Sequence, residues 1–177
     1  MLEETDFFEA PASSKYHNAF PGGLCEHCIN VYKRLSELNT LLSLKLDEDS
    51  IIIASLCHDL SKINYYMPSV RNEKVYSQSG SKHDELGNYD WVSTRTYSVK
   101  PTSQRFIYAN HEVTAEMITK SYIPLTYDES IAILHHHGGM SSDCAQDNLG
   151  EIFNYSSLAL CLHLADMIAS FINENRG

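Results

Sequence analysis

The residues of this chain best suited to chemistry are histidines and aspartates placed within apolar segments. His58 and Asp59 stand side by side at the end of an apolar run, and Lys62 follows four positions after the histidine. An ionised carboxylate in such a run is costly unless it is paired or binds a metal. Residues four apart share one face of a helix, so the lysine is placed to reach past a metal toward a phosphate. On their own, His58 and Asp59 also fit a hydrogen-bonded pair in a protein core.

Further histidines and a second aspartate accompany this pair. Asp166 lies in an apolar stretch and also needs a partner, while His27 lies early in a helical pattern. The other histidines of interest lie near predicted helix ends: His111, His135, His136 and His137. Neighbouring helix positions differ by about 100°, so three consecutive histidines cannot all face one ion. The richness in histidine and aspartate favours a metal site.

Helices are expected to position these side chains. Apolar residues recur at three- to four-residue steps from 24 to 42, the spacing of an amphipathic helix. Thr126 and Glu129 have capping-box spacing at the start of a later helix. The further helices expected span 51–60, 111–122, 131–137 and 155–173. The candidate histidines and aspartates all lie on or beside these segments.

Residues 64–106 break the helical period. Tyrosine, serine, threonine and asparagine dominate there, with prolines and glycines as breakers, and residues 91–99 suit a short hairpin. Such a stretch inside a compact domain is more typical of a functional insertion than of a linker. We therefore predict one all-α domain over 1–177, a helical bundle with a small irregular or β-hairpin insertion at 64–106. Residues 1–15 are expected to form a polar lead-in.

Composition narrows the classes of partner. Hydrophobic residues make up 43% and charged residues 20%, as in an ordinary globular domain, and the net charge of −10 disfavours duplex nucleic acid. No apolar run approaches the roughly 20 residues of a membrane helix, and the acidic start lacks a signal-peptide pattern. We expect a cytoplasmic protein that binds neither duplex nucleic acid nor a membrane. Its cysteines are expected to be reduced and mostly buried: Cys25, Cys28, Cys57, Cys144 and Cys161.

The order of the candidate residues resembles the HD-domain metal-dependent phosphohydrolases, whose signature is a lone histidine, then His-Asp, then a distant aspartate. The matching segments are Gly22-Gly23-Leu-Cys-Glu-His27, Leu56-Cys-His58-Asp59-Leu-Ser-Lys62 and Leu162-His-Leu-Ala-Asp166. The resemblance covers residues 16 to 172, nearly the whole chain. It implies an all-helical fold with a divalent metal at its centre.

The resemblance also implies a set of ligands. Those of a first metal would be His27, His58, Asp59 and Asp166. The additional His111 and His136-His137 are similar to those of members that bind two metals, with Asp59 as the bridge; of the triplet, His136 ranks first, His137 second and His135 third. Imidazole and carboxylate ligands suit one or two ions of Mn, Fe, Co, Ni or Zn.

The implied reaction is attack of a metal-activated water on phosphorus, with Asp59 and Lys62 as catalytic residues. Lys62 would neutralise charge that develops on the phosphate. Two further residues are candidates for substrate binding: Arg71 as a fork for phosphate oxygens and Trp91 as a stacking surface for a base. A packing lid or an oligomer contact is an equally good interpretation of the aromatic residues around Trp91.

Several functions fit this pattern. A small nucleotide-type substrate, such as a nucleoside mono- or triphosphate, suits the size of the chain. A cyclic or linear dinucleotide suits the two-metal histidine set. A 3′–5′ exoribonuclease is the alternative because residues 16–27 and His136-His137-Gly138 resemble the HD domains of bacterial enzymes of that class. A nucleotide-binding regulatory module that has kept the fold is the non-enzymatic alternative. The sequence leaves a homo-oligomer open.

Overall fold

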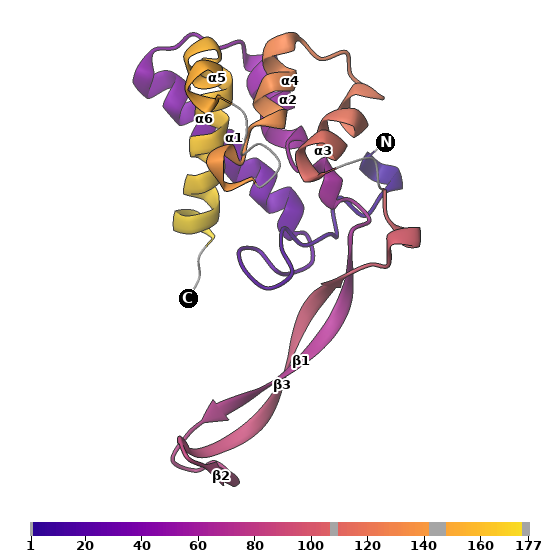
Figure 1. Ribbon diagram of the computed structural model, residues 1–177, viewed down its shortest axis with the longest axis vertical. Helices are drawn as coiled ribbons and strands as arrows, with labels where there is room; N and C mark the ends of the chain where they lie inside the picture. The colour runs from indigo at the N-terminus through magenta and orange to yellow at the C-terminus, as the bar shows by residue number, and fades with distance from the viewer. Residues whose placement is uncertain (1, 107–109, 142–147, 175–177) are drawn as a thin grey trace.

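The computed structural model describes residues 2–106, 110–141 and 148–174. Figure 1 shows a body of helices from which a long β-ribbon projects. The helices are α1 (Gly23–Leu42), α2 (Glu48–Cys57), α3 (His111–Lys120), α4 (Tyr127–Leu134), α5 (Leu149–Tyr155) and α6 (Ser157–Ile168), and α6 continues as a π-helical turn (Ala169–Asn173). The strands are β1 (Tyr66–Tyr76), β2 (Lys82–Asp84) and β3 (Gly87–Val99). The helical body is as expected, while the insertion is a regular antiparallel sheet.

Side-chain caps define where the helices begin. The Asp47 side chain accepts a hydrogen bond from the backbone N–H of Ser50 at the start of α2. Thr126 and Glu129 cap α4 reciprocally, so the predicted capping box is confirmed. Ser156 caps α6 and separates it from α5, which lies between the helices expected at 131–137 and 155–173.

Two apolar clusters hold the body together. The first joins α1, α2, α4 and α6, and its largest fully buried members are Val31, Leu35, Ile51, Leu158 and Leu162. The second joins the start of α1 to α3 and to the turn Leu60–Lys62, through residues such as Leu24, Leu60 and Ile63. His27 lies on α1 between Leu24 of the second cluster and Val31 of the first, so the site is built where the two clusters meet.

The first residues of the chain are packed against this body. Phe7 and Ala10 belong to the second apolar cluster, although the segment was expected to be a polar lead-in. Isolated apolar residues among polar ones have no periodicity, so the sequence pattern could not reveal this packing. The four described cysteines are free, and three of them are buried: Cys28, Cys57 and Cys161. Cys144 lies outside the described residues.

The ribbon is longer and more regular than the hairpin expected at 91–99. β1 pairs antiparallel with β3 from Tyr66 opposite Val99 to Tyr76 opposite Tyr89. The short β2 adds a third strand beside the tip of β3, with Lys82 opposite Tyr89. Most side chains from Val70 to Arg95 are exposed on both faces. A strand exposed on both faces lacks the apolar–polar alternation of a half-buried strand, which is why the sequence pattern did not predict its length.

Within the described residues, no single helix is long and apolar enough to cross a membrane. One pair of consecutive helices, α5 and the α6 segment through Asn173, is long and apolar enough when the two are taken together. The two helices are bent by 110° relative to each other.

Candidate metal centre

Three helices bring the predicted first-metal residues together. His27 comes from α1, His58 and Asp59 follow the end of α2, and Asp166 comes from α6. The Nε2 atom of His27 lies 3.2 Å from Oδ1 of Asp166 and 3.4 Å from Oδ2 of Asp59. It also lies 3.3 Å from Nε2 of His58. Side chains separated by more than a hundred positions in the sequence therefore converge on one small volume.

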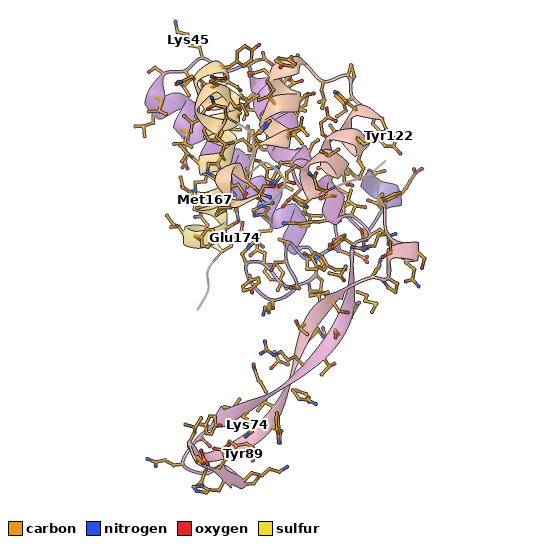
Figure 2. All side chains as sticks on the ribbon, in the orientation of Figure 1. Lys45, Lys74, Tyr89, Tyr122, Met167 and Glu174 are labelled. Atoms are coloured by element: carbon orange, nitrogen blue, oxygen red, sulfur yellow. The ribbon has the colours of Figure 1, made fainter. Side chains whose placement is uncertain are left out.

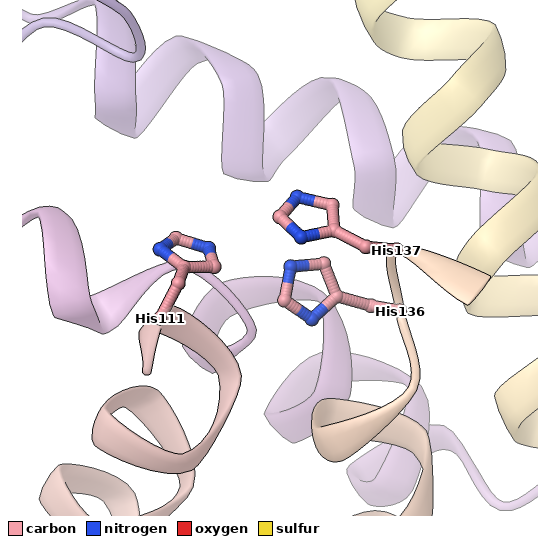
Figure 3. Close-up of side chains that lie close together, drawn as sticks. All are labelled: His111, His136 and His137. Atoms are coloured by element: carbon pink, nitrogen blue, oxygen red, sulfur yellow. The ribbon is translucent and has the colours of Figure 1, made fainter. Parts of the chain in front are cut away.

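A second group of histidines adjoins the first. His111 begins α3, and His136 and His137 follow the end of α4; Figure 3 shows the three rings facing one another. Their ligand nitrogens all lie within 4.8 Å of one another. The Nε2 atom of His111 lies 2.8 Å from Oδ1 of Asp59, and that of His136 lies 3.8 Å from the same oxygen. One carboxylate oxygen of Asp59 thus faces each group, as a bridging ligand requires.

The outward nitrogens of two rings are held by backbone carbonyls. His58 Nδ1 lies 2.8 Å from the carbonyl oxygen of Ser55, and His136 Nδ1 lies 2.7 Å from that of Ile133. A carbonyl oxygen only accepts hydrogen bonds, so each Nδ1 carries the proton and each Nε2 presents its lone pair to the cluster. Such outer hydrogen bonds are typical of histidines that bind metal.

Two other rings are held by glutamates. His27 Nδ1 lies 3.1 Å from Oε2 of Glu174, which is buried behind α1 just after the α6 segment. His137 Nδ1 lies 2.8 Å from Oε1 of Glu112. Sequence reasoning missed both glutamates as partners. The position of Glu112 beside His111 was a weak signal, and nothing in the sequence marks Glu174, because a contact across about 150 residues leaves no local pattern.

Burial keeps two histidines of the cluster in the neutral form. Burial lowers the pKa of His58 to about 4 and that of His136 well below its ordinary value, so both rings are neutral near pH 7. The Nε2 atom of His136 is buried and has no hydrogen-bond partner among the described residues. An unpartnered buried lone pair is costly, and a cation beside it would remove that cost. The donor set therefore fits a divalent transition metal.

The aspartates of the cluster stay ionised. Burial by itself would raise the pKa of Asp59, but the ammonium of Lys62, 2.7 Å away, and hydrogen bonds to His111 and His27 hold this pKa well below its ordinary value. Burial likewise opposes ionisation of Asp166, yet His27 lowers the pKa of that carboxyl. Burial by itself would lower the pKa of His27, but hydrogen bonds to Asp166 and Asp59 raise it well above its ordinary value. The cluster therefore contains two buried carboxylates that carry a negative charge and can bind a cation.

A cavity of about 240 Å³ opens beside the second histidine group. Its described lining comprises Ser61, Tyr65, Arg105, Phe106, Asn110, His111 and Thr114. The hydroxyl of Ser61 lies 2.6 Å from Nδ1 of His111, which links the cavity wall to the histidines. The guanidinium of Arg105 lies over the ring of Tyr65, and its buried Nε has no hydrogen-bond partner in the described part of the chain. Sequence reasoning did not single out Arg105.

The predicted substrate-binding residues are divided between the two parts of the molecule. Lys62 lies in the cluster, whereas Arg71 and Trp91 lie on the ribbon. Trp91 is opposite Lys74, and Figure 2 shows Lys74 near the far end of the ribbon, away from the helical body. The substrate roles of Arg71 and Trp91 stay predictions.

Three other histidines lie around the cluster. His135 bonds back to the carbonyl of Ile131 and is in none of the ligand groups formed by the described residues. The Nδ1 atom of His163 lies 2.7 Å from the carbonyl oxygen of His136, to which it donates a hydrogen bond. The ring centre of His17 lies 5.1 Å from that of His27. Residues 7–18 fold back over the start of α1, which places His17 beside the cluster.

Part of this chain is similar to a curated enzyme, the dihydroneopterin 2′,3′-cyclic phosphate phosphodiesterase of Methanocaldococcus jannaschii. The two are 36% identical over 63 residues, a match that covers 33% of this chain and 25% of the enzyme. The chain thus corresponds to about a quarter of the length of this relative. No family model matches the chain, and no solved structure matches it.

Proposed function

We propose that this protein is a divalent-metal-dependent phosphohydrolase that cleaves a phosphoester bond in a small nucleotide-type substrate. The position of Asp59 carries this proposal. One of its carboxylate oxygens faces His27, the other faces His111 and His136, and the side chain is 2% exposed. A buried carboxylate between two sets of inward-facing imidazoles suits a hydrolytic metal centre better than a structural core pair.

The residues of the site would have separate roles in holding metal and in binding the phosphate. One group that would hold metal is His27, His58, Asp59 and Asp166, and a second is His111, His136 and His137, with Asp59 shared. A bound divalent ion would supply Lewis acidity and lower the pKa of water. Lys62 keeps its ammonium next to Asp59, where it can neutralise negative charge on a phosphoryl oxygen. Arg105 lines the cavity beside His111 and would bind a further oxygen of the substrate.

A cyclic phosphodiester is the first substrate class to test. The similar enzyme from Methanocaldococcus jannaschii is named for a 2′,3′-cyclic phosphate of a pterin derivative. The cavity beside His111 has aromatic walls at Tyr65 and Phe106, which suit a flat heterocycle, and a volume that suits one ring system rather than a polymer. Nucleoside mono- and triphosphates, dinucleotides and single-stranded RNA are the alternatives.

A hydrolysis panel tests the proposal. Protein prepared without chelator is incubated with Mn²⁺ and each substrate class, namely 2′,3′-cyclic nucleotides, nucleoside mono- and triphosphates, cyclic dinucleotides and single-stranded RNA. We expect turnover of a small phosphoester that is lost in Asp59→Asn and retained in Asp49→Asn, an exposed aspartate of α2. Saturable nucleotide binding with no turnover of any substrate would support the regulatory module instead. Consumption of RNA alone would favour the exoribonuclease.

Metal analysis tests the number of ions. We expect two equivalents of metal per chain if both histidine groups are ligands, and one if only the first group is. His111→Ala should then remove the second equivalent and leave the first, because His111 contacts only the Oδ1 side of Asp59. His135→Ala is the matched control, since this histidine is outside the described ligand groups.

A further inference from the structure

The ribbon has one covered edge and one bare edge. β3 lies between β1 and β2, so the outer edge of β3 is covered near the tip by β2. Near the base of the ribbon, the N–H of Tyr97 donates to the carbonyl oxygen of Ser14 at 3.1 Å on that same edge. The outer edge of β1 has no such cover: among the described residues, no backbone group outside the sheet bonds to it. An uncovered edge of 11 residues is a template for pairing with another strand.

The register shows which backbone groups of β1 point outward. The N–H of Ser77 donates to the carbonyl of Asn88, and the N–H of Lys100 donates to that of Tyr65, at the two ends of the ladder. Both are hydrogen-bonded pairs in the β1–β3 register, and such pairs alternate along an antiparallel ladder. The odd-numbered residues of β1 therefore bond to β3. The even-numbered residues, with Asn72 at the middle, direct their backbone groups to the bare edge; each of them offers a C=O, and each except Pro68 also offers an N–H.

The side chains on this edge include an unpaired cation and an unpaired anion. Arg71 and Glu73 lie on the same face of β1, two residues apart, and both are exposed. Glu73 accepts a hydrogen bond from the hydroxyl of Thr94, and neither residue forms an ion pair within the part of the chain that the structure describes. Lys74, by contrast, is already paired with Asp84. A positive charge thus precedes Asn72 and a negative charge follows it, so the edge is complementary in charge to an antiparallel copy of itself.

We infer that two copies of this chain pair through their β1 edges, antiparallel, about a two-fold axis at Asn72. In this register, Asn72 meets Asn72 of the second copy in a hydrogen-bonded pair, because its backbone groups point outward. Arg71 of each copy then lies opposite Glu73 of the other, in non-hydrogen-bonded pairs whose side chains approach most closely. If the two-fold axis is moved by one residue, to Arg71 or to Glu73, then Arg71 lies opposite Arg71 of the second copy or Glu73 lies opposite Glu73. Only the axis at Asn72 joins opposite charges twice.

Pairing with a second copy also suits the rest of the ribbon. A two- or three-stranded ribbon without a covered face is weakly stable alone, and pairing of two copies would make a six-stranded sheet. Exposed apolar side chains such as Val70, which is 68% exposed, and Trp91 lie together on the other face of the ribbon from Arg71 and Glu73, and pairing of two copies would join these faces into one surface. Single-stranded nucleic acid fits less well, because the basic and acidic residues of 64–100 nearly balance: Arg71, Lys74, Lys82, Arg95 and Lys100 against Glu73, Asp84, Glu85 and Asp90.

Sedimentation equilibrium of the full chain tests this interface by charge exchange. We expect wild-type protein to sediment as a dimer, with twice the 20.0 kDa mass of the chain. Arg71→Glu alone and Glu73→Arg alone should each be monomeric, because each sets like charges opposite one another. An equimolar mixture of the two variants should form a heterodimer, and the double variant R71E/E73R should recover the dimer. Arg95→Glu, on β3 and away from the bare edge, is the matched control and should stay dimeric.

A second variant tests the register independently of charge. Paired residues at a hydrogen-bonded site have Cα atoms about 5.5 Å apart, which is within disulfide range. Asn72→Cys should therefore form a covalent dimer under mild oxidation, and Arg95→Cys should not. The inference is overturned if wild-type protein is monomeric at every concentration, or if it is a dimer that neither charge reversal weakens. Monomeric wild-type protein that binds single-stranded RNA through Arg71 would assign the ribbon to nucleic acid instead. None of these outcomes depends on hydrolysis at the metal centre.

Discussion

The helical body and the ribbon each contain a lysine paired with an aspartate. In the body, Lys62 Nζ lies 2.7 Å from Asp59, whose side chain is 2% exposed. In the ribbon, Lys74 Nζ lies 2.5 Å from Asp84, whose side chain is 26% exposed. The two contacts are similar in length, but the body removes its pair from water and surrounds it with four histidines, while the ribbon leaves its pair in solvent.

The contrast teaches that contact distance alone does not identify a functional pair. A buried carboxylate is costly unless further partners satisfy it, so the burial of Asp59 indicates a cation-binding role. An exposed ion pair contributes little to stability because water and salt screen it. Asp84 needs no function beyond ordering the tip of the ribbon, where it also accepts hydrogen bonds from Tyr76 and from the N–H of Leu86.

Neutralising one aspartate of each pair gives the largest contrast. Asp59→Asn removes the shared negative charge between the histidine groups, and we expect hydrolysis to fall on the order of 10³-fold or more. Asp84→Asn should leave the rate unchanged, because it lies on the ribbon. Initial rates on the most active substrate of the panel, with metal content measured in parallel, check this. Equal losses in the two variants would contradict the division of roles.

Truncating one leucine in each region tests how stability is distributed. Leu162 is fully buried in the first apolar cluster, and Leu162→Ala should lower the free energy of unfolding by about 2–5 kcal/mol. Leu86 is 81% exposed at the turn before β3, and Leu86→Ala should change it by no more than about 0.5 kcal/mol. Urea unfolding followed by far-UV circular dichroism measures both. A comparable loss for Leu86 would mean that the ribbon tip packs on something in solution.

Removing a glutamate that supports a ring should weaken metal binding. Glu174 accepts from Nδ1 of His27, and Glu174→Ala should lower metal affinity roughly 10- to 100-fold, because the ring loses its orientation. Glu85→Ala in the exposed ribbon is the matched control and should leave the affinity unchanged. Competition with a chromophoric chelator measures both constants. Unaltered affinity in Glu174→Ala would remove Glu174 from the supporting set.

The smallest effect concerns the ribbon pair and pH. The hydrogen bond from Lys74 lowers the pKa of Asp84 below its ordinary value of 3.8. A lowered pKa in the folded state means that the contribution is present above pH 3.8 and is lost as the pH falls through the lowered value. Lys74→Met should raise the pKa of Asp84 toward 3.8, which NMR titration of its carboxyl carbon can measure. No change in this pKa would show that the pair is not formed in solution.

Local sequence patterns predicted the helical body well. The apolar spacing from 24 to 42 corresponds to α1, and the capping box at Thr126 and Glu129 marks the start of α4. The family resemblance carried by the order of His27, His58, Asp59 and Asp166 selected side chains that the fold brings within 3.5 Å of one another in successive pairs. The helix patterns depend on neighbouring residues, so one sequence suffices to find them, whereas the grouping of the distant side chains was implied only by the family resemblance.

Contacts between distant segments were not accessible in this way. Glu174, Arg105 and His17 reach the site only because separate segments pack around α1 and α3. The long ribbon was underestimated because its strands are polar on both faces and have no apolar alternation.

The sequence by itself determined the residue types available to hold a metal, the helices that carry them and the acidic character of the chain, because these depend on residue type and local spacing. Only the tertiary structure decided that glutamates hold two of the rings, that Arg105 lines a cavity beside the histidines, and that one strand edge is left bare. These features arise from packing across many intervening residues. Such packing depends on how apolar faces meet in three dimensions, which no local pattern encodes.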